Sequence, residues 1–302
     1  MGVGTVSTYA AFQSTLNDVN TVETNLTKEQ EQLSSGNAFQ DFAGMAATGQ
    51  TQQYLSLSDT IARTTQYVEN HQTIEASVNT ASTVLGQIIK TATDLQSLIS
   101  QRMSGTSSAG FSTQLQGIWQ TLVGQLNTSV NNQYLFSGTA TNTPAVKNTF
   151  PTLQVPGTPD TGYYQGSGQD MTTRIDDNTV ITYNVRADAS GFQQLFAGLA
   201  TAQKGDQGNN TTDLQNAENF VQQGIAQITA LQATVGATAG QLTNSDTVLN
   251  NQKLYWQGLQ QSIGNTDIVS VSTQVAVNQG ILQASFAAFA KISALRLSDY
   301  LK

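Results

Sequence analysis

Apolar residues at every seventh position constrain this chain more than any other feature. Eight successive heptad positions are apolar: Leu214, Val221, Ile228, Val235, Leu242, Leu249, Trp256 and Ile263. Because a heptad repeat keeps one face of an α-helix against a partner, the pattern predicts a helix of about fifty residues, roughly 75 Å long. The companion positions are small or polar, as at Ala217, Gly224 and Thr238. This narrow seam favours close packing inside a bundle.

A second apolar seam, with alternating steps of three and four, predicts another long helix earlier in the chain. Its members are Val78, Ala81, Leu85, Ile88, Ala92, Leu95 and Ile99. The segment SGTSSAG (104–110) should then break the helix. A third helix is expected to carry Leu115, Trp119, Leu122 and Leu126 and to end within residues 131–145. Long helices joined by a tight reversal become antiparallel neighbours.

Both ends of the chain also predict amphipathic, lightly charged helices. The first apolar stripe consists of Phe12, Leu16, Val19, Leu26 and Leu33, and the last of Ile268, Val271, Val275, Leu282, Phe286 and Phe289. We expect residues 1–44 to pair with residues 264–302, so that the two ends of the chain form one long hairpin.

The pattern changes in the middle of the chain, where all four prolines fall within residues 144–159. Alternating residues then predict two short strands, one with Met171, Thr173 and Ile175 and one with Ile181, Tyr183 and Val185. Asp176-Asp177-Asn178 is a plausible turn between them. The predicted fold is mainly α: a long antiparallel helical bundle from both chain ends with a small β-rich insert. Its segments are the arms 1–44 and 264–302, helical parts 45–140 and 195–263, and the insert 141–194.

The segment NNQYLFSGTATNTPA (131–145) lies where the first helical part meets the insert. We expect its apolar triplet, Tyr134 to Phe136, to pack into this junction and fill it. Ser137 and Gly138 should then let the chain turn away. This interpretation is structural and needs no ligand.

Composition excludes several functions. Charged residues make up 11% of the chain, against about 25% in ordinary soluble domains, and Asn, Gln, Ser and Thr replace them. A net charge of −8 argues against nucleic-acid binding, which needs a basic face. Residues 268–290 are uncharged but too polar for a membrane anchor, and the first residues lack the pattern of a cleaved signal peptide. We expect neither nucleic acid nor membrane as a partner.

Candidates for chemistry are few. The chain has no cysteine and a single histidine, His71, which we interpret as an ordinary surface residue of a helix. Asp176 and Asp177 lack the spacing of a calcium loop, and GYYQGSGQ (162–169) lacks the lysine of a phosphate loop. Tyr163 and Tyr164 either form a sugar-stacking patch or, as we favour, pack the insert. We predict no enzyme, no metal and no cofactor.

Several segments resemble one protein family, the bacterial flagellins and their relatives. EQLSSGNAFQDFAG (31–44) is similar to the family's N-terminal signature through Leu33, Ser34, Ser35, Gly36 and Asp41, although Asn37 replaces the usual basic residue. The last residues, 282–301, resemble the family's closing helix. The middle segment is similar to the hook-associated branch of the family; the matching residues are Tyr134, Leu135, Phe136, Ser137, Gly138, Thr139 and Pro144.

The resemblance implies a structural component of the bacterial flagellum, at the junction of hook and filament. Its implied partners are further copies of itself, the hook-side junction protein, flagellin and a flagellar export chaperone. It also implies an extracellular location, reached through the flagellar type III apparatus, and terminal helices that fold on assembly. The eleven residues of the two terminal stripes are then the expected assembly interface.

Two other functions stay open at this stage. A short filament flagellin of the same family would share most of these motifs. A surface glycan-binding module, formed by the insert through Tyr163 and Tyr164, belongs to a different class.

Overall fold

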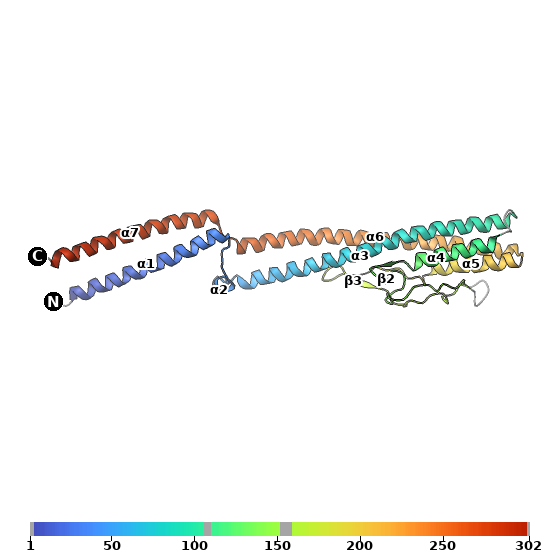
Figure 1. Ribbon diagram of the computed structural model, residues 1–302, viewed down its shortest axis with the longest axis horizontal. Helices are drawn as coiled ribbons and strands as arrows, with labels where there is room; N and C mark the ends of the chain where they lie inside the picture. The colour runs from blue at the N-terminus through green and yellow to red at the C-terminus, as the bar shows by residue number, and fades with distance from the viewer. Residues whose placement is uncertain (1–2, 106–109, 152–158, 301–302) are drawn as a thin grey trace. The chain divides into compact units, whose positions relative to one another are not determined.

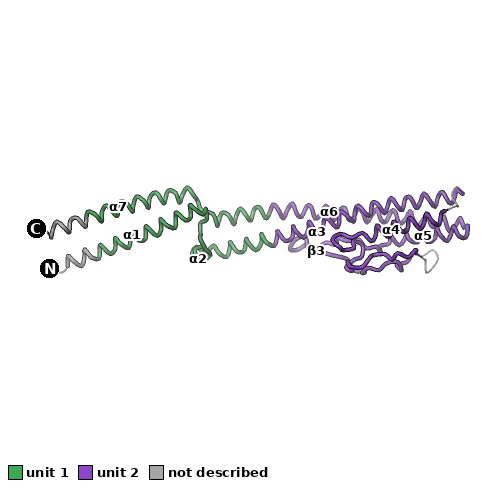
Figure 2. The backbone as a smooth tube through the Cα atoms, viewed as in Figure 1, with its two compact units in different colours: residues 1–62, 252–302 green, residues 63–251 purple. Residues whose placement is uncertain are grey.

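The computed structural model describes the backbone of residues 3–105, 110–151 and 159–300. It divides into two compact units, residues 1–62 with 252–302 and residues 63–251 (Figure 2). Two long helices, α3 (Thr51–Met103) and α6 (Thr211–Gly264), contribute to both units. The predicted fold class is confirmed: long antiparallel helices carry a small β-rich insert between α4 and α5 (Figure 1). The five predicted segments are finer than the two units and remain a prediction.

Unit 1 contains the two ends of the chain. Helix α1 (Val3–Ser35) lies beside α7 (Ile268–Tyr300) in the antiparallel sense (Figure 1). Gly36 ends α1 with a φ of 73°, a left-handed conformation that glycine adopts without steric cost. The Gly36 carbonyl accepts a hydrogen bond from Thr266 N, and Ala38 N donates to the carbonyl of Gly264. Backbone pairing therefore joins the end of α1 to the start of α7.

The next element in unit 1 is the short helix α2 (Phe42–Ala46). Asp41 is its N-cap, and its Oδ1 accepts a hydrogen bond of 2.7 Å from Gly44 N. A carboxylate at this position satisfies a backbone donor that has no partner within the helix. In the flagellin-like signature, Gly36 thus ends one helix and Asp41 begins the next.

Unit 2 is built on the two apolar seams of the sequence. Every predicted seam residue of α3 is buried, as are the six of α6 that lie in unit 2; of the two that lie in unit 1, Ile263 is buried and Trp256 half-buried. Helices α4 (Phe111–Leu126) and α5 (Ser190–Gln207) complete the bundle. Trp119 of α4 is buried with its ring 5.0 Å from that of Phe196. One apolar core therefore runs through unit 2.

Glycines at seven-residue spacing bring α5 close to α6. A Cβ on Gly191, Gly198 or Gly205 would lie within 2.7 to 3.0 Å of Ile228, Val221 and Leu214 respectively. These three partners are consecutive members of the α6 seam. Because a larger residue would force the helices apart, the glycines allow this close packing.

Two small antiparallel sheets lie between α4 and α5, one within the insert and one just before it. Strands β3 (Thr172–Arg174) and β4 (Val180–Thr182) pair with Thr173 opposite Ile181; the two predicted strands are present, but both are shorter than the alternation suggested, and β4 ends before Tyr183 and Val185. Strands β1 (Ser129–Val130) and β2 (Gln133–Tyr134) form a hairpin that the sequence analysis missed. Asn131 and Asn132 make its turn with positive φ, which asparagine tolerates better than most residues.

The predicted end of the third helix within 131–145 is wrong, because α4 ends at Leu126. The side chain of Asn127, just beyond it, donates to the Val146 carbonyl and accepts from Val146 N, both at 2.9 Å. This pairing ties the helix end to the insert. Local apolar spacing could not reveal a partner nineteen residues away.

Candidate assembly interface and insert anchor

The predicted assembly residues line the α1–α7 pair. Nine of the eleven are half-buried, whereas Ile268 and Phe286 are exposed; none is fully buried. The rings of Phe12 and Phe289 lie 5.2 Å apart across the pair. Among the side chains that the structure describes in α1 and α7, the one that is buried is polar Asn278. Its Nδ2 donates to both carboxylate oxygens of Glu29, at 2.8 and 2.9 Å.

This pairing leaves no apolar side chain that the structure describes in the two helices fully buried. Ordering a residue of backbone costs roughly 1–2 kcal/mol, which only burial of further surface can offset. A two-helix pair in which no described apolar side chain is fully buried gains little stability by itself. Additional protein surface against these helices would supply the missing burial.

The segment 134–139 anchors the insert to the bundle. Phe136 is fully buried, with its ring 6.3 Å from that of Phe192, and its carbonyl accepts a hydrogen bond from Ala187 N. The buried Ser137 Oγ donates to the Thr143 carbonyl at 2.6 Å. Tyr134, Leu135 and Pro144 are half-buried around this core. The apolar triplet thus has a structural role at the junction.

Gly138 lets this segment meet the loop 165–169. Its φ is 62°, and a Cβ there would lie 2.4 Å from the Ser167 carbonyl oxygen and 2.7 Å from that of Gln169. Two backbone hydrogen bonds stabilise this contact: Thr139 N donates to the Gln169 carbonyl, and Ser167 N donates to the Ser137 carbonyl. No side chain fits in this space, so the glycine is required by both conformation and contact.

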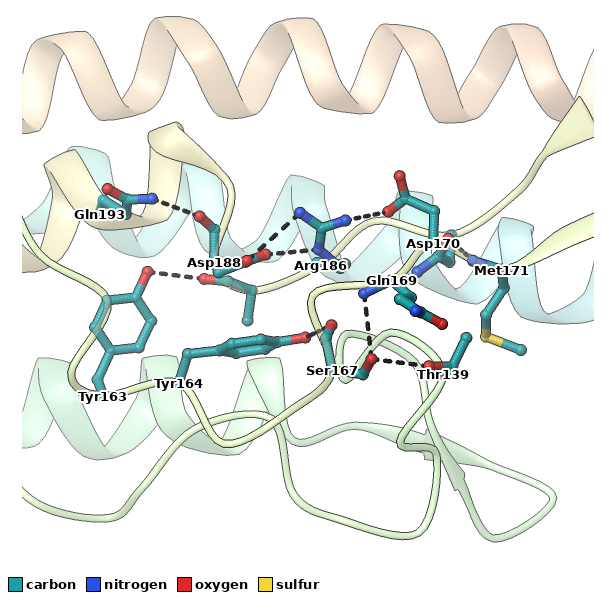
Figure 3. Close-up of polar contacts among 12 residues, drawn as sticks. Thr139, Tyr163, Tyr164, Ser167, Gln169, Asp170, Met171, Arg186, Asp188 and Gln193 are labelled. Carbon is teal, nitrogen blue, oxygen red and sulfur yellow. Dashed lines mark hydrogen bonds and ion pairs between the residues drawn. The ribbon is translucent and has the colours of Figure 1, made fainter.

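Polar contacts fasten the same loop to the start of α5 (Figure 3). The Arg186 guanidinium lies between two carboxylates, with Nη1 2.6 Å from Asp170 and Nε 2.9 Å from Asp188. The hydrogen bond to Asp188 raises the pKa of Arg186 above its ordinary value. Gln193 Nε2 donates to the Asp188 carbonyl at 2.6 Å. This ion network holds the insert in place.

The two tyrosines beside this network pack the insert. Tyr163 is buried and its hydroxyl donates to the Ala187 carbonyl, while the hydroxyl of Tyr164 donates to the Ser167 carbonyl, both at 2.8 Å (Figure 3). Burial raises the pKa of Tyr164 to about 12. Both hydroxyls are thus engaged inside the protein rather than presented to a sugar.

The interpretation of His71 as a surface residue is wrong, because its side chain is fully buried. Nδ1 lies 2.5 Å from Asp246 Oδ1 on α6, and Nε2 lies 3.3 Å from the Arg174 carbonyl on β3. His71 precedes Ile74 by three and Val78 by seven positions, so it occupies the apolar seam of α3. That spacing was the available signal for its burial. The ring joins two helices to the insert.

Chemistry-bearing clusters are scarce in the described ranges. Within them, no group of three or more His, Asp or Glu side chains is placed to hold a metal ion. No helix of the described chain has the length and apolar character needed to cross a membrane.

The N-terminal part of the chain is similar to the helical region of bacterial flagellins. Residues 6–141, just under half of the chain, match the model of the bacterial flagellin N-terminal helical region. The comparison with curated proteins gives no match. The family match covers the signature at 33–41 and the segment 134–139, and it confirms the resemblance seen in the sequence.

Solved structures of flagellar hook-associated proteins are similar to this chain in fold. A flagellar hook-associated protein from Vibrio parahaemolyticus is 16% identical, with a TM-score of 0.57 over 70% of this chain and 96% of that one. Hook-associated protein 3 of Legionella pneumophila is 10% identical, with a TM-score of 0.55 over 68% and 98%. FlgL of Bacillus cereus is 17% identical, with a TM-score of 0.51 over 63% and 98%. At these identities the likeness shows a shared fold.

Proposed function

We propose that this chain is a structural subunit of the bacterial flagellum that assembles at the junction of hook and filament. It would lie between the hook-side junction protein and flagellin, outside the cell, after export in an unfolded state by the flagellar type III apparatus with a chaperone. The flagellin-type N-terminal region and the hook-associated fold support this proposal.

The distribution of exposed apolar side chains carries the proposal. Eleven large hydrophobic residues are exposed among the described side chains, and nine of them belong to unit 1. They are Phe42, Leu55, Leu254, Tyr255, Ile268, Val269, Val277, Ile281 and Phe286. Concentrated exposed apolar surface marks a site of protein association. The terminal helices, whose described apolar side chains are at most partly buried, would complete their fold against neighbouring subunits.

The proposal is tested by introducing a charge on the apolar stripe of α7, to which Leu282 and Phe286 belong. In a strain lacking its own copy of the gene, Leu282→Asp and Phe286→Asp should block incorporation, because a carboxylate would be desolvated in the assembled interface. Val248→Asp is the matched control, since Val248 on α6 is 54% exposed and Phe286 53%. Thermal melting of the purified variants should match that of the unmodified protein. Normal motility with Phe286→Asp would contradict the proposed interface.

Immunogold electron microscopy of intact flagella then locates the protein. A narrow band between hook and filament is the expected result. Label along the whole filament would instead identify a short filament flagellin, which shares the fold and the N-terminal region.

A further inference from the structure

A cavity of about 330 Å³ lies in unit 2, between α3 and the strands of the insert. Its walls come from three places: α3 with Asn70 and Ile74, the segment around β2 with Gln133 and Tyr134, and the β3–β4 hairpin with its continuation at Tyr183. The volume falls within the range of about 300–1,000 Å³ that is typical of small-molecule sites. No residue of the terminal arms lines it, and the anchor segment contributes Tyr134 and Leu135 to its wall.

The lining of this cavity is polar but uncharged. Fourteen residues line it, and none is Asp, Glu, Lys, Arg or His. Three carry amides, five are Ser or Thr, two are Tyr and four are apolar. Amide and hydroxyl groups both donate and accept hydrogen bonds, as do the hydroxyls of a sugar. An ion would find no opposite charge among the lining side chains, so the lining suits a neutral, hydroxyl-rich ligand.

Asn184 offers a hydrogen-bond donor in this lining. Its Oδ1 accepts a hydrogen bond of 2.7 Å from Met171 N, which orients the amide. Its Nδ2 is buried and has no hydrogen-bond partner in the described part of the chain. Buried polar atoms are nearly always paired, so this donor calls for an acceptor.

Tyr134 and Tyr183 supply aromatic surface to the same cavity, and both are half-buried. Burial raises the pKa of the Tyr183 hydroxyl above its ordinary value, so this side chain combines a neutral polar tip with an apolar ring. A sugar ring presents C–H groups on one face and hydroxyls at its edge. The C–H face can stack on a tyrosine ring, while the hydroxyls hydrogen-bond to the neighbouring amides.

We propose that this cavity binds a neutral glycan of one or two sugar units. The site differs from the sugar-stacking patch that the sequence suggested at Tyr163 and Tyr164, whose hydroxyls are engaged elsewhere. The proposal does not depend on assembly into a flagellum.

Saturation-transfer NMR on the purified full chain tests the proposal. The probes are three neutral disaccharides, N,N′-diacetylchitobiose, lactose and maltose, with 3′-sialyllactose as a charged comparison. We expect saturable binding of at least one neutral probe, with a Kd on the order of 1 mM, and weaker binding of the charged one. No binding of any neutral probe would overturn the proposal.

Variants then assign the binding to the cavity. Asn184→Asp keeps the acceptor for Met171 N but replaces the free donor with an anion, and Tyr183→Ala removes a ring; each should weaken binding at least tenfold. Tyr183→Phe keeps the ring and should keep most of the affinity. Tyr67→Ala, outside the cavity, is the control. If Asn184→Asp fails to fold, the two Tyr183 variants decide, and equal binding by both would refute the site.

Discussion

Replacement of Gly138 tests whether the segment 134–139 anchors the insert. Gly138→Ala imposes two separate costs. Alanine at a φ of 62° costs about 1–2 kcal/mol by backbone conformation alone. In addition, its Cβ would lie 2.4 and 2.7 Å from two backbone carbonyl oxygens, so the loop 165–169 must move away.

Movement of that loop breaks two backbone hydrogen bonds, Thr139 N to Gln169 and Ser167 N to Ser137. Each contributes about 0.5–1.5 kcal/mol net, so the total loss, with the conformational cost, is about 2–5 kcal/mol in the free energy of unfolding. Urea unfolding followed by Trp119 fluorescence measures it, in a Trp256→Phe background that leaves one reporter inside unit 2.

Alanine substitutions at two other glycines of unit 2 separate the conformational cost from the cost of the loop contact. Gly105 has a φ of 77° and nothing within 4 Å of a built Cβ, so Gly105→Ala should cost about 1–2 kcal/mol through conformation alone. Gly168 has neither a positive φ nor a near neighbour, and Gly168→Ala should be nearly neutral. If Gly138→Ala were no more destabilising than Gly105→Ala, the contact with the loop would not matter and the anchoring argument would fail.

Three further predictions concern packing and charge in unit 2. Gly198→Ala should destabilise unit 2 by about 1–3 kcal/mol through overpacking against α6. Gly117→Ala, with open space at its Cβ, should instead stabilise the unit by up to about 1 kcal/mol. Equal effects of the two substitutions in urea unfolding would refute close helix packing. Asp246→Ala should cost about 1–3 kcal/mol by leaving buried His71 without its carboxylate partner, and an unchanged urea midpoint would count against that contact. Backbone hydrogen bonds lower the pKa of Asp176, so its stabilising effect is present above about pH 4 and is lost as the pH falls through the lowered value. Asp176→Asn should remove this part of the acid sensitivity; unfolding midpoints at pH 5 and pH 3 that change equally with and without the substitution would contradict it.

Local pattern determined the long elements of this protein. The heptad run from Leu214 to Ile263 predicted α6, and the 3–4 spacing from Val78 to Ile99 predicted the core face of α3, because periodicity records which face of a helix must leave water. Alternation likewise placed the β3–β4 hairpin. The signature near residues 33–41 was recognisable because a helix end needs particular residues at particular positions, such as Gly36 and Asp41.

Tertiary structure decided which distant groups cover those faces. His71 is buried because Asp246, 175 residues later, and the Arg174 carbonyl of the insert meet its ring. Gly138 is needed because the Ser167 and Gln169 carbonyls approach it. Periodicity measures the polarity of a helix face, but not the identity of its partner. The cavity beside Asn184 likewise exists only where α3, β2 and the β3–β4 hairpin converge, because its walls come from segments that no local pattern connects.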